Sequence, residues 1–205
     1  MLKDMNLKSF LDTTISDAPV PGGGSVAALS GALAAALSGM VANLTIGKKK
    51  YADFEAPMKE VLERMNVLKD ELLEDIDRDA KAFDGVMACF KMPKETDEDK
   101  KNRKEAMQKA FKEASEVPFE VAKKCIKVMD EAEYVVVNGN KNAVTDGAVS
   151  AMMARTACLS ALYNVRINLS SIKDEEYKNN LEKEVEILES LAKERETAIL
   201  SLVKL

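Results

Sequence analysis

The sequence is most constrained by an uncharged run of 22 residues, positions 25–46, that directly follows three consecutive glycines. Most of the run is alanine, glycine or serine, and helices with such small side chains can approach their neighbours closely. We therefore predict a long helix that forms the buried axis of a helical bundle. A transmembrane span is the alternative, because the length suits a bilayer. Polar residues interrupt the run, however, and isoleucine and phenylalanine are scarce in it, so no membrane partner is expected.

A glycine loop leads into this helix. The prolines before it resist helix formation, while Gly22, Gly23 and Gly24 permit a tight turn and leave their N–H groups uncovered. Ser25 is the expected N-cap. A helix that starts here presents unpaired N–H groups and its positive dipole end, which suits an anion or a carbonyl oxygen. The alternative is an entry loop whose only role is to start the helix.

Composition limits the classes of function. The 205 residues suffice for one domain with a substantial core, and 46% hydrophobic with 32% charged residues is typical of a soluble, helix-rich protein. The net charge of −5 argues against nucleic acid as a partner. The absence of histidine excludes His–metal sites and Ser–His dyads, which leaves proton transfer to Asp, Glu, Lys, Tyr or Cys. No secretory signal is recognised, so a cytoplasmic location is expected.

The cysteines are three in number, far apart, and each lies within an apolar helical pattern. We interpret Cys89, Cys125 and Cys158 as reduced core residues, with a reactive thiol as the alternative.

Apolar periodicity predicts a single all-α domain, residues 1–205, built as a bundle of about five long helices and a short N-terminal helix. Pro118 falls inside one helix, where it should kink or split the helix and free a backbone carbonyl one turn earlier. Another helix follows an Asn-rich turn and takes Thr145 or Asp146 as its cap. Besides the helix after the glycines, the expected helices cover residues 3–12, 57–90, 97–133, 146–172 and the segment from Asp174 onward.

One aspartate interrupts an apolar stripe. Counting in sevens along the helix of residues 57–90 gives Met65, Leu72 and then Asp79, where an apolar side chain is expected. A buried carboxylate must be paired, hydrogen-bonded or neutral. Asp79 is therefore a candidate catalytic residue, with a structural salt bridge as the alternative. The neighbouring Asp75, Asp77 and Asp84 are expected on solvated faces.

A second face of small residues occurs in the helix of residues 146–172. It should pack closely on the glycine-led helix, with its two asparagines bonding across the contact. Arg155 lies on an otherwise apolar strip of the same helix, either as a buried partner for a carboxylate or with its charged group extended to water. The face consists of Ser150, Ala154, Ala157, Ala161, Asn164 and Asn168.

Several segments together resemble one family. These are PVPGGGSVAALSGALAAALSGMV, DAKAF at positions 79–83 and GNKNAVTD at positions 139–146. They are similar to the cyclodeaminase domain of formiminotransferase-cyclodeaminases and to stand-alone bacterial cyclodeaminase/cyclohydrolase proteins, over nearly the whole chain. The resemblance implies an all-helical subunit, a homodimer with folate near its interface, and tetrahydrofolate one-carbon chemistry. It also implies that Asp79 is the proton acceptor.

The expected activity is conversion of 5-formiminotetrahydrofolate to 5,10-methenyltetrahydrofolate with release of ammonia. The alternative is a methenyltetrahydrofolate cyclohydrolase that gives 10-formyltetrahydrofolate, and a minor one is a non-catalytic helical interaction module. A tetrahydrofolate derivative is the expected substrate, with no permanently bound cofactor and no metal. The expected substrate-binding residues are Gly22, Gly23, Gly24 and Ser25 through backbone N–H groups, Asn140, Asn142 and Asp146 at the pterin edge, and Lys48 at the glutamate tail.

Overall fold

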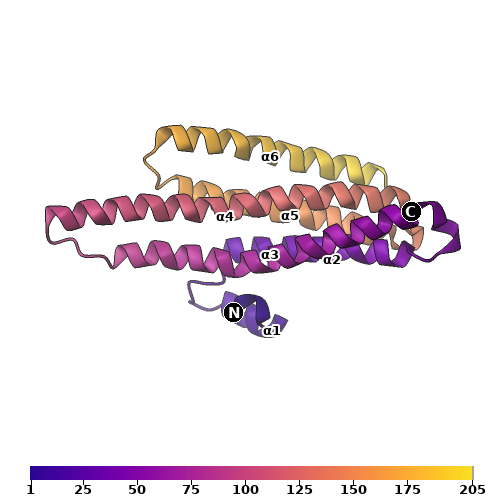
Figure 1. The fold of residues 1–205 in the computed structure, drawn as a ribbon, viewed down its shortest axis with the longest axis horizontal. Helices are drawn as coiled ribbons and strands as arrows, with labels where there is room; N and C mark the ends of the chain where they lie inside the picture. The colour runs from indigo at the N-terminus through magenta and orange to yellow at the C-terminus, as the bar shows by residue number, and fades with distance from the viewer. Residues whose placement is uncertain (205) are drawn as a thin grey trace.

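Six α-helices make up the structure, a computed structural model that describes residues 1–204 (Figure 1). No β-strand occurs among these residues, so the predicted all-α class is confirmed. The helices are α1 (Leu7–Thr14), α2 (Gly23–Thr45), α3 (Glu55–Phe90), α4 (Asp97–Asn138), α5 (Val144–Leu169) and α6 (Glu175–Ser201), with 3-10 turns η1 (Leu2–Asp4), η2 (Lys49–Phe54) and η3 (Lys141–Ala143).

Helices α2 to α5 form an antiparallel bundle. Helix α2 packs against α3 and α5, and α4 packs against the same two helices from the other side. Helix α6 covers α4 and α5 from outside, and α1 lies on the opposite side of the bundle from α6 in Figure 1. Because the four helices alternate in direction, the beginning of α2 lies near the end of α3 and the beginning of α4.

The α3–α4 hairpin is longer than the rest of the bundle. Helices α3 and α4 have 36 and 42 residues, against 23 in α2 and 26 in α5. The hairpin therefore extends beyond the start of α2 (Figure 1). There α3 and α4 hold each other through a small apolar cluster of their own, centred on Val86, Cys89, Ala110 and Ala114. A cavity lies between this extension and the first turn of α2.

Helix α2 is the buried axis that its small residues predict. A Cβ added at Gly31 would lie 3.0 Å from Cys125 Sγ of α4, so glycine permits this close contact. On the other side, Ser150 of α5 donates a hydrogen bond to the Ala34 carbonyl at 2.7 Å and lies 2.8 Å from the Ser38 hydroxyl. By length and composition α2 would also pass as a membrane span, but 61% of its most apolar window is buried within the bundle.

Two predicted helix starts are wrong by one or more residues. Helix α2 begins at Gly23 with Gly22 as its N-cap, so Ser25 lies in the first turn instead of capping it. The reason is that the Ser25 hydroxyl has a carboxylate partner on α3. Helix α5 begins at Val144, and Asn140 caps the preceding turn η3, so neither Thr145 nor Asp146 is a cap.

Pro118 does not split its helix, and α4 continues through it. Proline has no N–H, so the carbonyl of Ala114 lacks its helical partner. Asn168 of α5 supplies the replacement, because its Nδ2 donates to the Ala114 oxygen at 2.8 Å. The prediction that Pro118 frees a backbone carbonyl one turn earlier is therefore confirmed. The prediction that Asn168 bonds across the contact with α2 is wrong, because its side chain bonds to α4.

All three cysteines are buried and unpaired, as expected. Burial raises the pKa of Cys125 well above the usual thiol range and that of Cys158 to about 12, which disfavours the reactive-thiol alternative. Arg155 faces Glu196 of α6 at 3.5 Å, so it is the partner of a carboxylate.

The prediction that Asp75 lies on a solvated face is wrong. Its side chain is only 1% exposed, and it contacts Arg78 at 2.6 Å and Lys124 at 2.7 Å. These two cations compensate the buried charge and join α3 to α4.

Candidate active site

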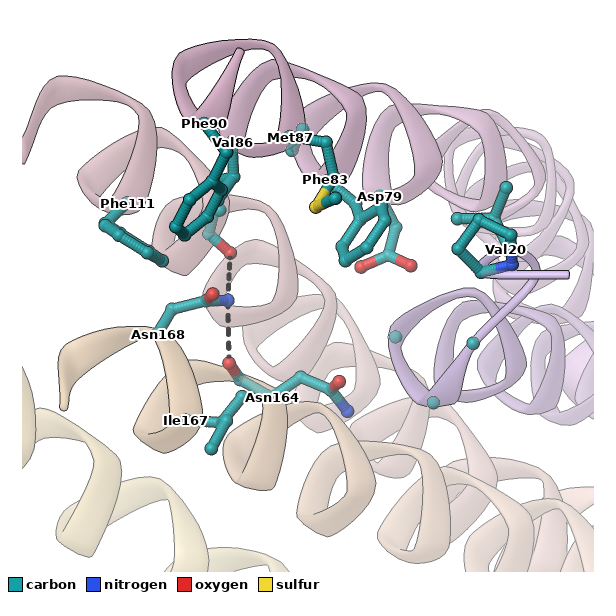
Figure 2. A pocket seen from close by; sticks show the side chains of 16 residues that line it. Val20, Asp79, Phe83, Val86, Met87, Phe90, Phe111, Asn164, Ile167 and Asn168 are labelled. Carbon is teal, nitrogen blue, oxygen red and sulfur yellow. Dashed lines mark hydrogen bonds between the residues drawn. The ribbon is translucent and has the colours of Figure 1, made fainter. Parts of the chain in front are cut away.

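A cavity of about 460 Å³ opens where α2 begins beneath the α3–α4 extension. Ligand pockets for small molecules usually measure a few hundred to about 1,000 Å³. The glycine loop forms one end, α3 and α4 form an apolar wall, and the second half of α5 lies opposite (Figure 2). The cavity thus joins segments that are far apart in the sequence.

Asp79 of α3 points into this cavity beside the start of α2 (Figure 2). The Ser25 hydroxyl donates to Asp79 Oδ2 at 2.8 Å and also lies 3.3 Å from the Ile76 carbonyl. A carboxylate has about four acceptor positions, so these contacts leave acceptor capacity for a ligand.

Burial raises the pKa of the Asp79 carboxyl, and hydrogen bonds from the Ser25 hydroxyl and backbone N–H oppose this rise in part. No Lys or Arg among residues 1–204 forms an ion pair with Asp79, whereas Asp75, one turn earlier on α3, has two. Asp75 therefore joins two helices, while Asp79 has the features of a proton acceptor: partial burial, a raised pKa and a cavity in front of it.

The glycines allow α2 to approach Asp79. A Cβ on Gly24 would lie only 2.0 Å from Asp79 Oδ1, so any larger residue there would displace the carboxyl group. At Gly23 a Cβ would lie 3.2 Å from the Asn164 amide nitrogen. No side chain of the N-cap residue bonds to the helix start, so the N–H groups of Gly23 and Gly24 remain available at the cavity, whereas that of Ser25 bonds to Asp79.

Two asparagines from α5 line the cavity, Asn164 beside the glycine loop and Asn168 on the side of Phe111 (Figure 2). The Nδ2 of Asn168 donates both to the Ala114 carbonyl at 2.8 Å and to the Asn164 carbonyl at 2.9 Å. Both of its hydrogens are thereby used, which fixes the amide and leaves its oxygen as the group for a ligand. Pro118 contributes to this arrangement from outside the cavity, because it frees the Ala114 carbonyl.

Sequence reasoning missed the aromatic wall of the cavity. The apolar helical spacing of the segment 57–90 predicts Phe83 and Phe90 on its core-facing stripe, yet they are 37% and 49% exposed and line the site. Phe111 of α4 completes this wall. The available signal was their position after Asp79, in the part of α3 that extends beyond α2.

The structure separates the predicted catalytic and substrate-binding residues into two groups. Gly22, Gly23, Gly24 and Asp79 line the cavity, with Ser25 directly behind it. The remaining four lie beyond the other end of α2, which at 1.5 Å per residue is about 30 Å away. They are Lys48, Asn140, Asn142 and Asp146.

Asn140 has a structural role at that far end. Its Nδ2 donates to the Leu44 carbonyl and its backbone N–H to Thr45 Oγ1, each at 2.9 Å, so it caps the C-terminus of α2. The glycine loop and the asparagine loop therefore do not meet within a single chain. The antiparallel topology places them at opposite ends of the bundle.

Comparison with known proteins gives a consistent result. The profile of the family described as formiminotransferase-cyclodeaminase matches residues 6–187. The chain is 42% identical to a methenyltetrahydrofolate cyclohydrolase from Methylorubrum extorquens, over 91% of this chain and 89% of that protein. It is 34% identical to formimidoyltransferase-cyclodeaminase from Gallus gallus over 97% of this chain, but it spans only 37% of that longer protein.

A solved structure also matches. The crystal structure of a formiminotetrahydrofolate cyclodeaminase from Thermotoga maritima superposes with a TM-score of 0.89 at 31% identity, covering 99% of this chain and 98% of that one. All of these relatives bear the names of enzymes, which leaves the non-catalytic interaction module without support.

Proposed function

The chain belongs to the formiminotransferase-cyclodeaminase family, and we propose that it converts 5-formiminotetrahydrofolate to 5,10-methenyltetrahydrofolate and ammonia. The observation that carries this proposal is Asp79, a partly buried carboxyl group with a raised pKa and no cationic partner among the described residues, at a cavity of small-molecule size. A base of this kind is what the reaction requires.

In the proposed reaction N10 of the folate attacks the carbon of the protonated formimino group on N5 and forms a new C–N bond. Asp79 accepts the proton that N10 loses and returns it to the formimino nitrogen, which then carries three hydrogens, and its bond to carbon breaks as ammonia leaves. The remaining carbon bridges N5 and N10 as the methenyl cation. The raised pKa of Asp79 lies closer to neutral pH than the pKa of an exposed aspartate, which makes the carboxylate a better proton acceptor.

The cavity supplies groups to hold the substrate in a folded conformation. The aromatic wall of Phe83, Phe90 and Phe111 suits stacking against flat rings, while the start of α2 and the Asn168 amide oxygen provide polar contacts on the other side. Holding N10 close to the formimino carbon contributes through proximity, because this intramolecular attack then starts from one fixed conformer of the substrate.

The second candidate is the cyclohydrolase reaction. The specific observation in its favour is the identity of 42% to a methenyltetrahydrofolate cyclohydrolase that the chain matches over 89% of its length. In this reaction Asp79 would accept a proton from water as the water attacks the methenyl carbon. It would pass this proton to N5 as the N5–C bond breaks, and the hydroxyl group of the adduct would lose its proton to solvent, which gives 10-formyltetrahydrofolate.

Two assays at equal enzyme concentration distinguish the candidates. Ammonia release from 5-formiminotetrahydrofolate measures the first reaction, and decay of methenyl absorbance measures the second. Asp79→Asn should reduce the relevant rate by about 100-fold or more while the fold persists. Wild-type activity in that variant would exclude Asp79 as the base, and absence of both activities in the wild-type protein would overturn the proposed function.

We also propose a homodimer formed through α2. Val26, Leu33 and Met40 lie seven residues apart on this helix, and each is between 37% and 49% exposed. A two-fold axis would pair two α2 helices in antiparallel orientation, which would bring Asn140 of one chain toward the glycine loop of the other. Leu33→Glu should then shift the mass in solution from dimer to monomer by light scattering. A monomeric wild-type protein would contradict the proposal.

The cytoplasm is the proposed location. Its support is the state of the three cysteines, which are buried and unpaired, as is usual for proteins of a reducing compartment. Microscopy of a fluorescently tagged chain would test this point.

A further inference from the structure

Asp79 is the only titratable side chain among the described residues that line the candidate active site. Helix α2 carries no charge between positions 25 and 46, and α5 contributes the neutral amides of Asn164 and Asn168. Helix α4 contributes Phe111 and Ala114. No cation of residues 1–204 therefore lines the cavity to stabilise the ionised form of Asp79, although a proton acceptor must be ionised before it can act.

The charged neighbours of Asp79 on its own helix are engaged elsewhere. Arg78 pairs with Asp75 at 2.6 Å and with Glu120 at 2.8 Å. Side chains two positions apart point to different sides of a helix, and the charged residues at that spacing from Asp79 are Asp77 and Lys81. None of these groups replaces a cation beside the Asp79 carboxyl group.

Ser25 supplies the stabilisation that a cation would otherwise give. Its side chain is fully buried, and its hydroxyl donates to Asp79 Oδ2 at 2.8 Å. The Ser25 backbone N–H also bonds to the carboxyl group. A hydrogen bond to an ionised acceptor is roughly twice as strong as one to a neutral acceptor, so the hydroxyl favours the carboxylate over the carboxylic acid.

The same hydrogen bond orients the carboxyl group. Oδ2 is held at the first turn of α2, while no side chain of residues 1–204 donates a hydrogen bond to Oδ1. Once Asp79 carries a proton at Oδ1, Oδ2 becomes a carbonyl oxygen and a weaker acceptor. The Ile76 carbonyl, 3.3 Å from the Ser25 hydroxyl, is then a second acceptor for the hydroxyl hydrogen. The hydroxyl therefore has a partner in both protonation states of Asp79.

We propose that Ser25 is a positioning residue of the reaction, whose buried hydroxyl holds Asp79 Oδ2, presents Oδ1 to the substrate and keeps the carboxyl group ionised before each turnover. This inference rests on the proposed function. In the transfer from the folate, the N10–H bond breaks and an O–H bond forms at Oδ1, while Ser25 neither gains nor loses a proton. Ser25 thus acts through Asp79, whereas the prediction from sequence was a direct contact of its backbone N–H with the substrate.

Ser25→Ala removes the hydroxyl and tests this proposal. The pKa of Asp79 can be measured by carbon-13 NMR of labelled aspartate carboxyl groups, with Asp79→Asn identifying the resonance. This pKa should rise by about one pH unit in Ser25→Ala, and the acidic limb of the pH profile of kcat/KM should move to higher pH by the same amount. At a pH above both pKa values, kcat/KM should still be about tenfold below that of the wild type, because the carboxyl group is no longer held in one orientation.

Ser38→Ala is the matched control. Ser38 is also a fully buried serine of α2, and its hydroxyl lies 2.8 Å from that of Ser150. At 1.5 Å per residue it lies about 20 Å from Ser25 along the helix. This variant should lose a buried hydrogen bond, and therefore some stability, without any change in the pKa of Asp79 or in kcat/KM.

Ser25→Cys is a second variant at the same position. It keeps a side chain of similar size, but a thiol donates only weakly. Both the pKa of Asp79 and the acidic limb should therefore move in the same direction as in Ser25→Ala by a smaller amount. Circular dichroism verifies that each variant folds, and Ser25→Cys carries the test if Ser25→Ala does not.

The outcomes separate this inference from the proposed function. An unchanged Asp79 pKa in Ser25→Ala, or an equal rise in Ser38→Ala, would overturn the role of Ser25 while leaving Asp79 as the base. Wild-type kcat/KM in Ser25→Ala at a pH above both pKa values would also overturn it. A pKa that rises without any movement of the pH profile would instead show that Asp79 is not the base, which contradicts the proposed function itself.

Discussion

Gly24→Ala provides a direct test of the close contact between α2 and Asp79. Ordinary Cβ contacts begin at 3.4 Å, but the new Cβ would lie 2.0 Å from Asp79 Oδ1, so the carboxyl group must move by about 1.4 Å. A displacement of about 1 Å at a reacting group can reduce a rate by about 100-fold. We therefore expect kcat/KM to fall by about that factor.

The expected change in stability is much smaller. Alanine in place of glycine favours a helix by about 1 kcal/mol, whereas loss of the charged hydrogen bond from Ser25 to Asp79 costs about 1.5–3 kcal/mol. The free energy of unfolding should thus decrease by about 0.5–2 kcal/mol, which for a protein of this size lowers Tm by a few degrees. The variant would remain folded while losing most of its activity.

Gly85→Ala is the matched control. Gly85 also lies in a helix, and no atom is within 4 Å of a Cβ added there, so this variant should gain the helix-forming benefit of alanine without any contact to the site. Its Tm should rise slightly and its kcat/KM should equal that of the wild type. Wild-type kcat/KM in Gly24→Ala would refute the reasoning, because Asp79 would then not need its position beside the helix start.

Three further predictions concern other parts of the same framework. Asp79→Asn should raise the free energy of unfolding at neutral pH, because a pKa raised in the folded state means that folding disfavours the ionised carboxylate. This gain in stability should vanish below pH ~4, where the wild-type carboxyl group is protonated in both the folded and the unfolded state. Denaturant titrations at two pH values measure both effects. Pro118→Ala supplies a backbone N–H that competes with Asn168 for the Ala114 carbonyl, so the Asn168 side chain should lose its fixed orientation. KM should then rise several-fold with little change in Tm. An unchanged KM would show that Pro118 does not help to orient Asn168. Unfolded thiols ionise near pH ~8.5, but the folded Cys158 thiol has a pKa of about 12, so the stability of the folded protein should decrease as the pH rises between these values. In the Cys158→Ala variant, Tm should decrease less steeply over the same pH range.

The sequence was sufficient to identify the central helix and the key carboxylate. An alanine-rich uncharged run is best stabilised in water by close neighbours, and α2 has them in α3, α4 and α5, except on the face of Val26, Leu33 and Met40. The seven-residue count isolated Asp79 because the stripe before it is buried without exception at Met58, Met65 and Leu72. The structure adds what the count could not: a partner in Ser25 and a cavity beside the carboxyl group.

The sequence does not show that the glycine loop and the asparagine loop lie at opposite ends of a single chain. The two polar loops look alike in sequence, since each opens a long helix. Counting helix directions would have separated them, because in an antiparallel bundle the connection between α4 and α5 lies at the C-terminal end of α2. The aromatic wall was harder to foresee. Whether Phe83 and Phe90 are core or cavity residues depends on how far α3 extends beyond α2, and helix lengths are set by tertiary packing.

The small side chains of α2 have a consequence for how this site can change. On that side the cavity is bounded by backbone, since Gly22, Gly23 and Gly24 offer no side chain to exchange and Gly24 tolerates no added atom. On the other side it is bounded by bulky side chains of α3 and α4 that are partly exposed. New substrate preferences, whether selected in nature or in the laboratory, should therefore arise from substitutions at Phe83, Phe90 or their neighbours, while the helix opposite stays as it is.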